Sequence, residues 1–387
     1  MERIYKEALR LHKRTHGKLE IISKVPLETR TDLSRAYTPG VAQVSTAIGK
    51  QKSLARIYTI KQNTVAVVSD GSAILGLGNL GPEAALPVME GKAALFKRFA
   101  HIDAFPICLA TQDTEKIIST IKYIAPVFGG INLEDISAPR CFEIERRLQA
   151  ELDIPVLHDD QHGTAVVVLA ALINALKITQ RSKRHVKIVI NGAGAAGTAI
   201  AELLISYGIM HVVLCDSQGV IYKGRAKLNS AKHMLAEITN RSCLKGLRAD
   251  GCIIGDLTSA LRGADVFIGV SAASILKASM IRIMNKEPII FAMANPIPEM
   301  MPNAAKKAGA AIVASGRSDF PNQINNVLAF PGIFRGALDH KIKKITTSML
   351  LQAAHNLAGC VKNPTTDQII PSIFDARVVP AITRAIL

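Results

Sequence analysis

Three glycines that follow a strand-like run have the spacing most closely tied to a specific chemistry. Gly192, Gly194 and Gly197 come after the β-branched residues 186–190 in the order G-x-G-x-x-G. At this spacing the first glycine permits a tight turn, and the second lets a pyrophosphate approach the backbone. The third lets the next helix pack closely against the strand. The run therefore predicts a dinucleotide site.

The residues after these glycines supply the other contacts that a dinucleotide needs. Ala195 and Ala196 begin a helix-like run at 195–207, whose free N–H groups and positive dipole end would face the phosphates. A second strand-like run, 211–215, ends at Asp216. An acid about 20 residues past the glycines is placed to accept hydrogen bonds from ribose hydroxyls, so we expect NAD.

A second stretch with the same glycine spacing is a weaker candidate. Residues 76–81 read G-L-G-N-L-G after a strand-like run at 65–69. However, Asp70, Gly71 and Ser72 lie among the residues between the strand and the glycines, and Pro82 follows the glycines. No second strand ends in an acid at the required distance. We therefore favour residues 192–197 as the nucleotide site.

Two pairs of adjacent acids lie beside strand-like runs and could hold a metal ion. Glu134 and Asp135 lie in G-G-I-N-L-E-D-I, and Asp159 and Asp160 lie in L-H-D-D-Q-H-G-T. Three carboxylates that converge from two loops suit Mg²⁺ or Mn²⁺ and leave positions for substrate oxygens. Adjacent acids are also common as solvated loop residues or helix caps, so spacing alone leaves a metal site open.

His158 and His162 resemble the H-x-x-x-H pair of zinc sites. That interpretation needs both histidines on one helix. Residues 154–157 are strand-like and the next helix is predicted to begin only near Gly163, so we expect the two rings to diverge.

Four further polar residues could act on a substrate or serve only the structure. Lys92 is an ordinary surface lysine or, beside a bound dication, an amine that can be neutral and act as a general base. Tyr37 precedes a Pro-Gly turn and is a structural tyrosine or a proton donor. Asn325 and Asn326 carry adjacent amides that could cap backbone or bind a carboxylate.

Composition limits the class of protein. With 387 residues and 49% hydrophobic residues, the chain is long and apolar enough for two domains with sizeable cores. The net charge of +16 would suit a polyanion, but the basic clusters are short and separate, aromatic residues are 4% of the chain, and there is no Trp. We expect a small anionic substrate and no nucleic acid.

The same sequence predicts a cytoplasmic protein without a membrane segment. The most apolar stretch, 164–176, is too short to cross a bilayer, and the N-terminus lacks the apolar core of a secretory signal. The six cysteines form no C-x-x-C pair, which favours reduced thiols.

The predicted elements indicate an α/β fold. Strands at 65–69, 104–109 and 154–157 mix with helices at 82–99, 114–124 and 139–151, followed by a linking helix at 163–178. From residue 185 strands and helices alternate, which predicts a Rossmann-like, doubly wound parallel sheet. These strands are 186–190, 211–215, 265–269, 288–294 and 311–314, and the helices are 195–207, 230–240, 257–262 and 300–308. We expect a substrate and metal domain at 1–161, a nucleotide domain at 162–345 and C-terminal helices at 346–387.

Taken together, the motifs resemble those of the malic enzymes in their short bacterial form. The matching segments span most of the chain in order: S-R-A-Y-T-P-G-V-A (34–42), S-D-G-S-A-I-L-G-L-G-N-L-G (69–81), L-P-V-M-E-G-K-A-A-L-F-K (86–97), F-G-G-I-N-L-E-D-I (128–136), H-D-D-Q-H-G-T-A (158–165), N-G-A-G-A-A-G (191–197) and N-N-V-L-A-F-P-G-I (325–333).

The resemblance implies oxidative decarboxylation of L-malate to pyruvate and CO₂, with reduction of NAD(P), and a homodimer. It implies roles for individual residues: Glu134, Asp135 and Asp160 as metal ligands, Lys92 as the base for the C2 hydroxyl, Tyr37 as the acid for the enolate carbon, and Asn295 and Asn326 as substrate contacts, with Asn295 also near the cofactor. Tyr37 or Lys92 would reach into the partner's cleft.

Two features depart from the pattern or leave it open. Longer malic enzymes carry an arginine for the substrate carboxylate where this chain has Ser72-Ala73, so the C4 carboxylate needs another partner, such as amides or a basic residue of the neighbouring subunit. Basic residues after Asp216 could compensate for its charge and admit NADP; these are Lys223, Arg225 and Lys227.

Two other functions stay open on the sequence alone. An amino-acid dehydrogenase also pairs a lysine with a nucleotide domain but needs no divalent metal. A non-catalytic sensor would bind a dicarboxylate and NAD without turnover.

Overall fold

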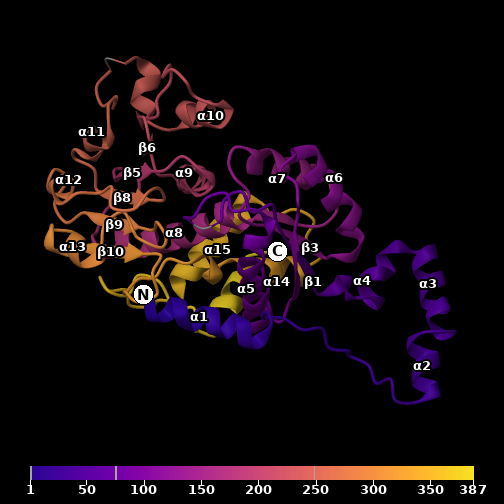
Figure 1. Cartoon of the computed structure of the whole chain (residues 1–387). Helices are drawn as coiled ribbons and strands as arrows, with labels where there is room; N and C mark the ends of the chain where they lie inside the picture. Colours follow the sequence, from indigo (N-terminus) through magenta and orange to yellow (C-terminus); the bar gives the residue numbers. More distant parts are fainter. Residues whose placement is uncertain (1, 75, 248) are drawn as a thin grey trace.

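The computed structural model describes residues 2–74, 76–247 and 249–387. Leu75, within the 69–81 segment, lies outside the described residues. The chain forms one parallel and one mainly parallel sheet, each covered by helices, with an N-terminal arm that extends away from both (Figure 1). The predicted α/β class and Rossmann-like second sheet are confirmed.

The first sheet has four parallel strands in the order β2-β1-β3-β4. Both β1 and β3 are buried throughout, as a parallel sheet covered on two faces requires. The strands are β1 (Thr64–Ser69), β2 (Asp103–Cys108), β3 (Gly130–Leu133) and β4 (Val156–His158), and the helices between them are α5 (Pro82–Ala100), α6 (Thr114–Ile124) and α7 (Arg140–Glu151). The carboxyl ends of β3 and β4 are neighbours in this sheet.

The second sheet has six strands in the order β10-β9-β8-β5-β6-β7. They are β5 (Lys187–Asn191), β6 (His211–Asp216), β7 (Gly219–Val220), β8 (Val266–Gly269), β9 (Ile289–Ala292) and β10 (Ile312–Ser315). The helices that accompany them are α9 (Ala195–Tyr207), α10 (Ser230–Ile238), α11 (Leu257–Leu261), α12 (Ala278–Arg282) and α13 (Pro302–Lys307). The chain order reverses between β5 and β8, and ligands of such sheets bind at this switch point.

Helix α8 (Asp159–Ile178) joins the two sheets through one continuous core. It packs against α9 and α15 (Thr347–Gly359), and its apolar residues are almost all buried. It is long and apolar enough to cross a membrane, but 72% of that window is buried inside the structure, as in a core helix. Helix α14 (Phe330–Asp339) completes the core, where Phe330 and Phe334 pack edge-on against Phe96.

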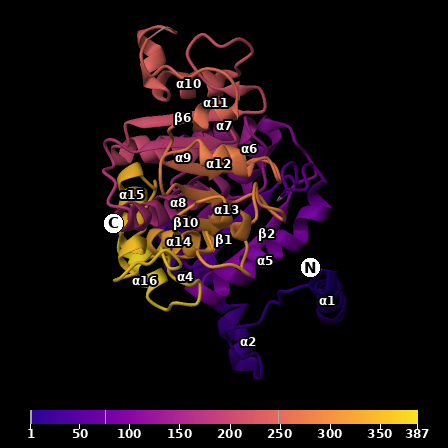
Figure 2. The ribbon, with the colours of Figure 1, turned by 90° about the vertical axis from the view of Figure 1, so that its left-hand side faces the viewer.

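The N-terminal arm has no buried residue in α2, α3 or α4. Helix α1 (Glu2–Thr15) lies beside α5, and the chain then runs out to α2 (Arg30–Ala36), α3 (Gly40–Lys50) and α4 (Ala55–Tyr58), seen at the lower right of Figure 1. Figure 2 shows α2 below the body of the molecule from the second direction. Many large apolar side chains of the arm are exposed, including Ile21 (89%) and Ile22 (72%).

Several expectations need correction. The strand β3 was noted only as a strand-like run before Glu134 and was left out of the predicted strands, and the short antiparallel edge strand β7 was not predicted. Helix α8 begins at Asp159 rather than near Gly163, because β4 ends at His158 and the two acids already form the first helical turn. The tail is helical only in α15 and α16 (Val378–Thr383), since prolines and turns occupy the chain between them.

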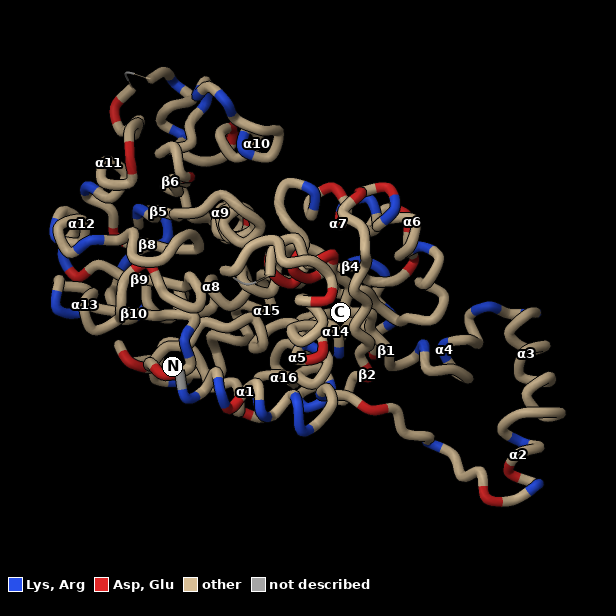
Figure 3. Tube along the Cα trace, in the orientation of Figure 1, with Lys and Arg blue, Asp and Glu red and all other residues tan. Residues whose placement is uncertain are grey.

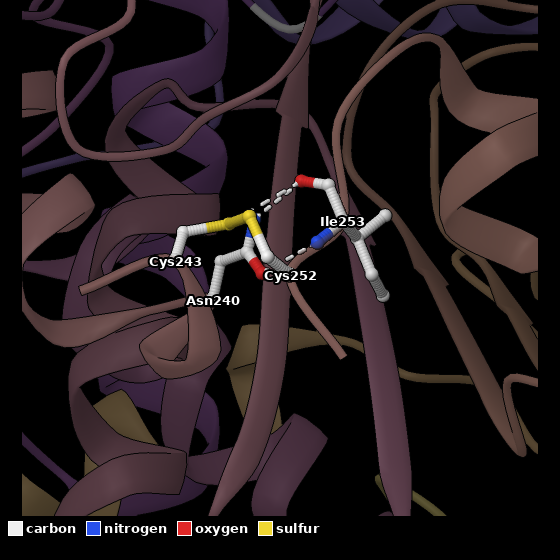
Figure 4. Close-up of a disulfide and its surroundings, with 4 residues drawn as sticks. All are labelled: Asn240, Cys243, Cys252 and Ile253. Atoms are coloured by element: carbon white, nitrogen blue, oxygen red, sulfur yellow. Dashed lines mark hydrogen bonds between the residues drawn. A yellow bond between two sulfur atoms is a disulfide. The ribbon is translucent and has the colours of Figure 1, made fainter. Parts of the chain in front are cut away.

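Reduced thiols throughout the chain were also a wrong expectation. Cys243 and Cys252 form a disulfide in the segment between α10 and α11 (Figure 4). The pairing was missed because a nine-residue separation matches no short motif. The other four cysteines are free.

Candidate functional site

The carboxyl edge of the first sheet brings the predicted acids together. Glu134 and Asp135 directly follow β3, and Asp160 lies in the first turn of α8, directly after β4. One carboxylate oxygen from each of these three residues lies within 4.8 Å of the others. The three carboxylates therefore converge, which their spacing along the sequence alone could not decide.

Backbone contacts fix this cluster. The Asp135 N–H donates to Asp160 Oδ2 at 2.9 Å, and the Asp135 carbonyl accepts from the Ala73 N–H at 3.0 Å. Asp135 has a φ of 53°, in the left-handed region that aspartate tolerates better than most residues. The loop after β3 is thus tied both to α8 and to the loop after β1.

Lys92 reaches the same acids from α5. Its Nζ lies 2.7 Å from Glu134 Oε1 and also donates to Asp159 Oδ2. The lysine side chain is only 6% exposed, and its Nζ lies 4.3 Å from the centre of the Phe330 ring. Lys92 is therefore a buried ammonium held between two carboxylates, and the interpretation as an ordinary surface lysine is wrong.

Burial and mutual repulsion make the acids hard to ionise together. Burial raises the pKa of Asp159 to about 7, with the Glu134 carboxylate adding to the rise and Lys92 opposing it. Burial likewise raises the pKa of Glu134 and of Asp160. Burial disfavours the charged form of Lys92, but Asp159 and Glu134 outweigh it and raise the pKa of the lysine.

The residues present fit a divalent cation. Two oxygens that bind one Mg²⁺ at about 2.1 Å are at most roughly 4.2 Å apart, so the cluster needs only a small contraction. Four carboxylates meet a single ammonium here, and the buried Asp159 Oδ1 has no hydrogen-bond partner among the described residues. A dication would offset this excess of negative charge.

The two histidines do not form a zinc site. His158 ends β4 and His162 lies in α8, and the only metal-like group among the described residues is the three-acid cluster. Glu145 instead receives hydrogen bonds from the His158 N–H at 2.7 Å and from Gln161 Nε2 at 3.2 Å, and His162 Nε2 lies 3.0 Å from its carboxylate. His158 is the N-cap of α8 and His162 lies in its first turns, so the expected late start of this helix was wrong, and the divergence of the rings stays a prediction.

Glu145 was missed by the sequence analysis, although a signal exists. It lies on the buried face of α7 with Cys141, Ile144 and Leu148. An acid on an apolar helix face must find partners, and Glu145 finds them at the start of α8. It positions the turn that carries Asp159 and Asp160.

The glycine turn of the second sheet has the predicted shape. Gly192 has a φ of 119°, and a Cβ there would stand 2.4 Å from the Val270 carbonyl oxygen. A Cβ at Gly197 would stand 1.7 Å from the Gly192 carbonyl oxygen, whereas one at Gly194 would meet nothing within 4 Å. The turn and the helix contact thus require glycine, and the open space at Gly194 suits a close pyrophosphate.

This turn adjoins the first sheet. Ala195, at the start of α9, packs against the apolar cluster that contains Ile131 and Leu133 of β3. Ala196 is half-buried in the same first turn. A Cβ at Gly76 would stand 1.9 Å from the carbonyl oxygen of Asn295, so the loop after β1 also touches the loop after β9. The second glycine stretch, 76–81, therefore forms part of an interdomain contact.

Asp216 ends β6 as predicted, but it is not a free acid. Arg225 donates to both of its oxygens, at 2.9 and 2.5 Å, and Lys232 Nζ lies 2.7 Å from Oδ2. Burial would raise the pKa of Asp216, but the hydrogen bonds from Arg225 and Lys232 outweigh it and lower the pKa. Arg225 compensates for the acid as foreseen. Lys232 was missed, and Lys223 pairs with Glu237 instead.

Of the two substrate asparagines, Asn326 lies close to the acids. It begins a short 3-10 turn (Asn326–Leu328), and a Cβ at Gly163 in α8 would stand 3.4 Å from its Cβ. Asn325 caps this turn, since its side chain accepts from the Val327 N–H at 3.0 Å. Asn295 lies at the interdomain contact described above.

Glu299 is a further buried acid that the sequence analysis missed. Its oxygens accept from the Ser271 N–H at 2.9 Å and the Ala294 N–H at 3.0 Å. It thereby joins the loops after β8 and β9, next to the Asn191–Ser271 hydrogen bond at the end of β5.

Tyr37 is a predicted site residue that lies away from the acidic cluster of its own chain. It lies between α2 and α3 on the arm, and its side chain is 66% exposed. Figure 1 shows these helices away from the sheet edge that carries the acids.

The fold and the site define a class: a two-domain dinucleotide-dependent oxidoreductase with an acidic cluster and a buried lysine between its domains. Comparison with known proteins then gives the family. The malic enzyme N-terminal domain matches residues 16–149, and the malic enzyme NAD binding domain matches residues 161–386. The chain belongs to the malic enzyme family.

Individual relatives agree along nearly the whole chain. It is 54% identical to the bifunctional malic/malolactic enzyme of Bacillus subtilis, over 98% of this chain and 91% of that protein. It is 54% identical to the NAD-dependent malic enzyme of Geobacillus stearothermophilus, over 96% and 76% respectively. The crystal structure of the NAD-dependent malic enzyme from Thermotoga maritima matches with a TM-score of 0.93 and 50% identity, over 98% of both chains.

Proposed function

We propose that the protein catalyses oxidative decarboxylation of L-malate to pyruvate and CO₂ with reduction of NAD(P), as a metal-dependent malic enzyme. The observation that carries this is the buried Lys92 between Glu134 and Asp159, at a sheet edge whose acids adjoin the glycine turn. A base, a metal site and a hydride acceptor thereby share one interdomain space.

Each residue has a chemical task in this proposal. With a dication held by the three acids, the charged form of Lys92 would be disfavoured. The neutral amine then takes the proton of the C2 hydroxyl as the C2 hydride is transferred, and Tyr37 donates a proton to C3 after CO₂ has left. Asn295 and Asn326 hold the substrate through amide hydrogen bonds. Glu134, Asp135 and Asp160 would hold Mg²⁺ or Mn²⁺, which supplies Lewis-acid stabilisation of the charge that develops on substrate oxygens.

Asp159 orients the Nζ of Lys92 within the acidic cluster. Its hydrogen bond to Nζ is made by a fully buried carboxylate, whose other oxygen has no hydrogen-bond partner among the described residues. It is thus a positioning residue for the base.

The partner of the C4 carboxylate is a separate part of the proposal. Ser72 Oγ accepts from Arg140 Nη2 at 2.9 Å and donates to Asp70 at 2.6 Å. Arg140 is also paired with Asp70 at 2.8 Å, so it is already used in shaping this loop. We propose that amides or a basic side chain of a second subunit bind the C4 carboxylate.

We further propose a homodimer in which Tyr37 enters the partner's site. The arm exposes apolar side chains that monomers seldom leave in contact with water. These include Leu33 (53%), Val41 (37%) and Val44 (36%), which flank Tyr37 on α2 and α3. A second copy would bury this surface and supply the proton donor that one chain leaves outside its own site.

NAD is the preferred cofactor in this proposal. Two of the similar proteins are named NAD-dependent, and the matching domain is an NAD binding domain. NADP stays possible, because Arg225 and Lys232 offset the charge of Asp216.

Several expectations from the sequence stay predictions. They are the domain limits 1–161, 162–345 and 346–387, a cytoplasmic location, and the absence of a nucleic-acid or membrane partner. Lys and Arg are spread over both halves of the chain among Asp and Glu, which supports a small anionic substrate (Figure 3).

One assay matrix tests the function. Malate is supplied with NAD or NADP, and with Mn²⁺, Mg²⁺ or EDTA, while reduced nucleotide and pyruvate are measured together. Equimolar formation of both products that stops in EDTA supports the proposal. Activity that survives thorough chelation would favour a metal-independent dehydrogenase, and binding of malate without any product would favour a sensor.

A further inference from the structure

A cavity lies at the edge of the second sheet away from the glycine turn. It has a volume of about 770 Å³ and is lined by the first residues of β5 and β6, including Lys187 and His211. The nucleotide residues Gly192 and Asp216 lie at or just beyond the opposite ends of the same two strands. The cavity is therefore distinct from the cofactor site.

One wall of this cavity comes from residues 240–247 and 249–253, which a pair of hydrogen bonds and a disulfide hold together. Asn240 Nδ2 donates to the Ile253 carbonyl at 2.6 Å, and the Ile253 N–H donates back to Asn240 Oδ1 at 3.2 Å. The Cys243–Cys252 disulfide closes the same segment beside this amide pair (Figure 4). The Asn240 N–H also donates to the Val212 carbonyl at 2.7 Å, which anchors the wall to β6.

Basic side chains dominate the lining. Arg241, Lys245 and Arg262 join Lys187 and His211, and Asp250 is the one acid among the lining residues. Within residues 2–74, 76–247 and 249–387, no ion pair or hydrogen bond joins the side chain of Arg241, Lys245 or Arg262 to an acid. Arg225, in the same domain, is by contrast paired with the carboxylate of Asp216.

Apolar side chains line the rest of the cavity. Met210 is 46% exposed and Leu244 38% exposed, although both are large hydrophobic residues. Exposed apolar surface beside unpaired cations suits a ligand that has an apolar or aromatic body and an anionic end.

We propose that this cavity binds an organic phosphate of nucleotide size. Its phosphates would contact Arg241 and Arg262, whose guanidinium groups can each bind two phosphate oxygens, and Lys245, whose ammonium binds them as a point charge. Its ring would lie on Met210 and Leu244. A volume of about 770 Å³ falls within the range of small-molecule sites. The disulfide holds Arg241 and Lys245 on a fixed wall, which favours binding by pre-organisation.

Equilibrium dialysis of radiolabelled ADP against the full-length protein tests the proposal. Saturating NAD blocks the cofactor site, and EDTA keeps divalent ions from the acidic cluster. We expect one ADP bound per chain, with pyrophosphate competing weakly and adenosine hardly at all. The double variant Arg241→Glu/Arg262→Glu should weaken ADP binding at least tenfold. Reduction of the disulfide should also weaken ADP binding, by a smaller factor.

Matched controls separate a site from general attraction to a basic protein. Arg282→Glu changes an exposed arginine of α12 outside the cavity and should leave ADP binding unchanged. Malate turnover by each variant reports whether it folds, and Arg241→Gln/Arg262→Gln replaces the double variant if it does not. Equal weakening by Arg282→Glu, or ADP binding that disappears when NAD is saturating, would overturn the proposal.

Discussion

Replacement of Lys92 by alanine tests the chemistry at its most specific residue. The ammonium lies 2.7 Å from Glu134, also pairs with Asp159, and has a side chain that is only 6% exposed. A positioned general base contributes about 10²–10⁴ in rate, so kcat should fall by that factor, or roughly 3–5 kcal/mol in the barrier. The KM for malate should change only severalfold, because the metal and the asparagines still hold the substrate.

The loss of a buried cation also affects stability. Removing one partner of a buried ion pair costs about 3–5 kcal/mol, so Lys92→Ala should lower the melting temperature, and Mn²⁺ should recover part of the loss. Steady-state kinetics and thermal unfolding are therefore measured on the same preparations.

Chemical rescue separates the base from a purely structural lysine. The alanine variant leaves space for a small primary amine, and added ethylamine should restore turnover with a pH dependence set by that amine. Lys97→Ala is the matched control, because Lys97 lies on the same helix with a 61% exposed side chain paired to Asp103, and surface pairs contribute about 0–1 kcal/mol. Wild-type turnover by Lys92→Ala, or no rescue from a folded variant, would refute the assignment.

Three further perturbations follow from the structure. Gly197→Ala would place a Cβ 1.7 Å from the Gly192 carbonyl oxygen, so the glycine turn must shift and the KM for NAD should rise at least tenfold. Initial-rate kinetics would detect this rise, and an unchanged KM for NAD would contradict the assignment of this turn to the cofactor. Arg225→Ala should lower kcat/KM for NADP about tenfold and kcat/KM for NAD much less, because a nearby cation contributes roughly 1–2 kcal/mol to the binding of a 2′-phosphate after screening. An equal fall in kcat/KM for NAD would argue against a role of Arg225 in selecting the cofactor. Mixing the inactive variants Tyr37→Phe and Lys92→Ala should restore up to about 25% of wild-type activity if each site uses Tyr37 of the partner, and no restoration in confirmed mixed dimers would exclude a shared site.

Much of the fold could be predicted from local patterns. Apart from α8 and the C-terminal helices, the predicted strands and helices formed within two residues of the expected limits, because buried β-branched runs, glycines and caps are local signals. The expected start of α8 was four residues late, since the acids of its first turn resemble a loop when read alone. The strand β3 was missed because its four residues include Gly130 and Asn132, which are poor strand formers.

The parts of the candidate site that depend on local sequence signals were predicted, and those that depend on contacts between distant segments were not. Glu134, Asp135 and Asp160 converge as proposed, because parallel strands end at one edge of a sheet. The pairing of Lys92 with Asp159 depends on how α5 packs against α8, and no spacing along the chain shows that contact. Lys232 at Asp216 and Glu299 between two loops are also contacts between distant segments.

Tyr37 shows a different limit of sequence reasoning. The motif around it resembles a catalytic segment, yet a single chain leaves the side chain 66% exposed on an extended arm. Whether such a residue acts depends on the surface of a second copy, and neither local pattern nor single-chain packing contains that information.

The most direct test of the central claim is the position of a bound Mn²⁺ ion. Crystals of the protein soaked in Mn²⁺ would be measured at the manganese absorption edge, with Asp160→Asn as the comparison. The account predicts one anomalous peak about 2.0–2.3 Å from oxygens of Glu134, Asp135 and Asp160, and its loss in the variant. A peak elsewhere, or full occupancy among these residues without the Asp160 carboxylate, would contradict it.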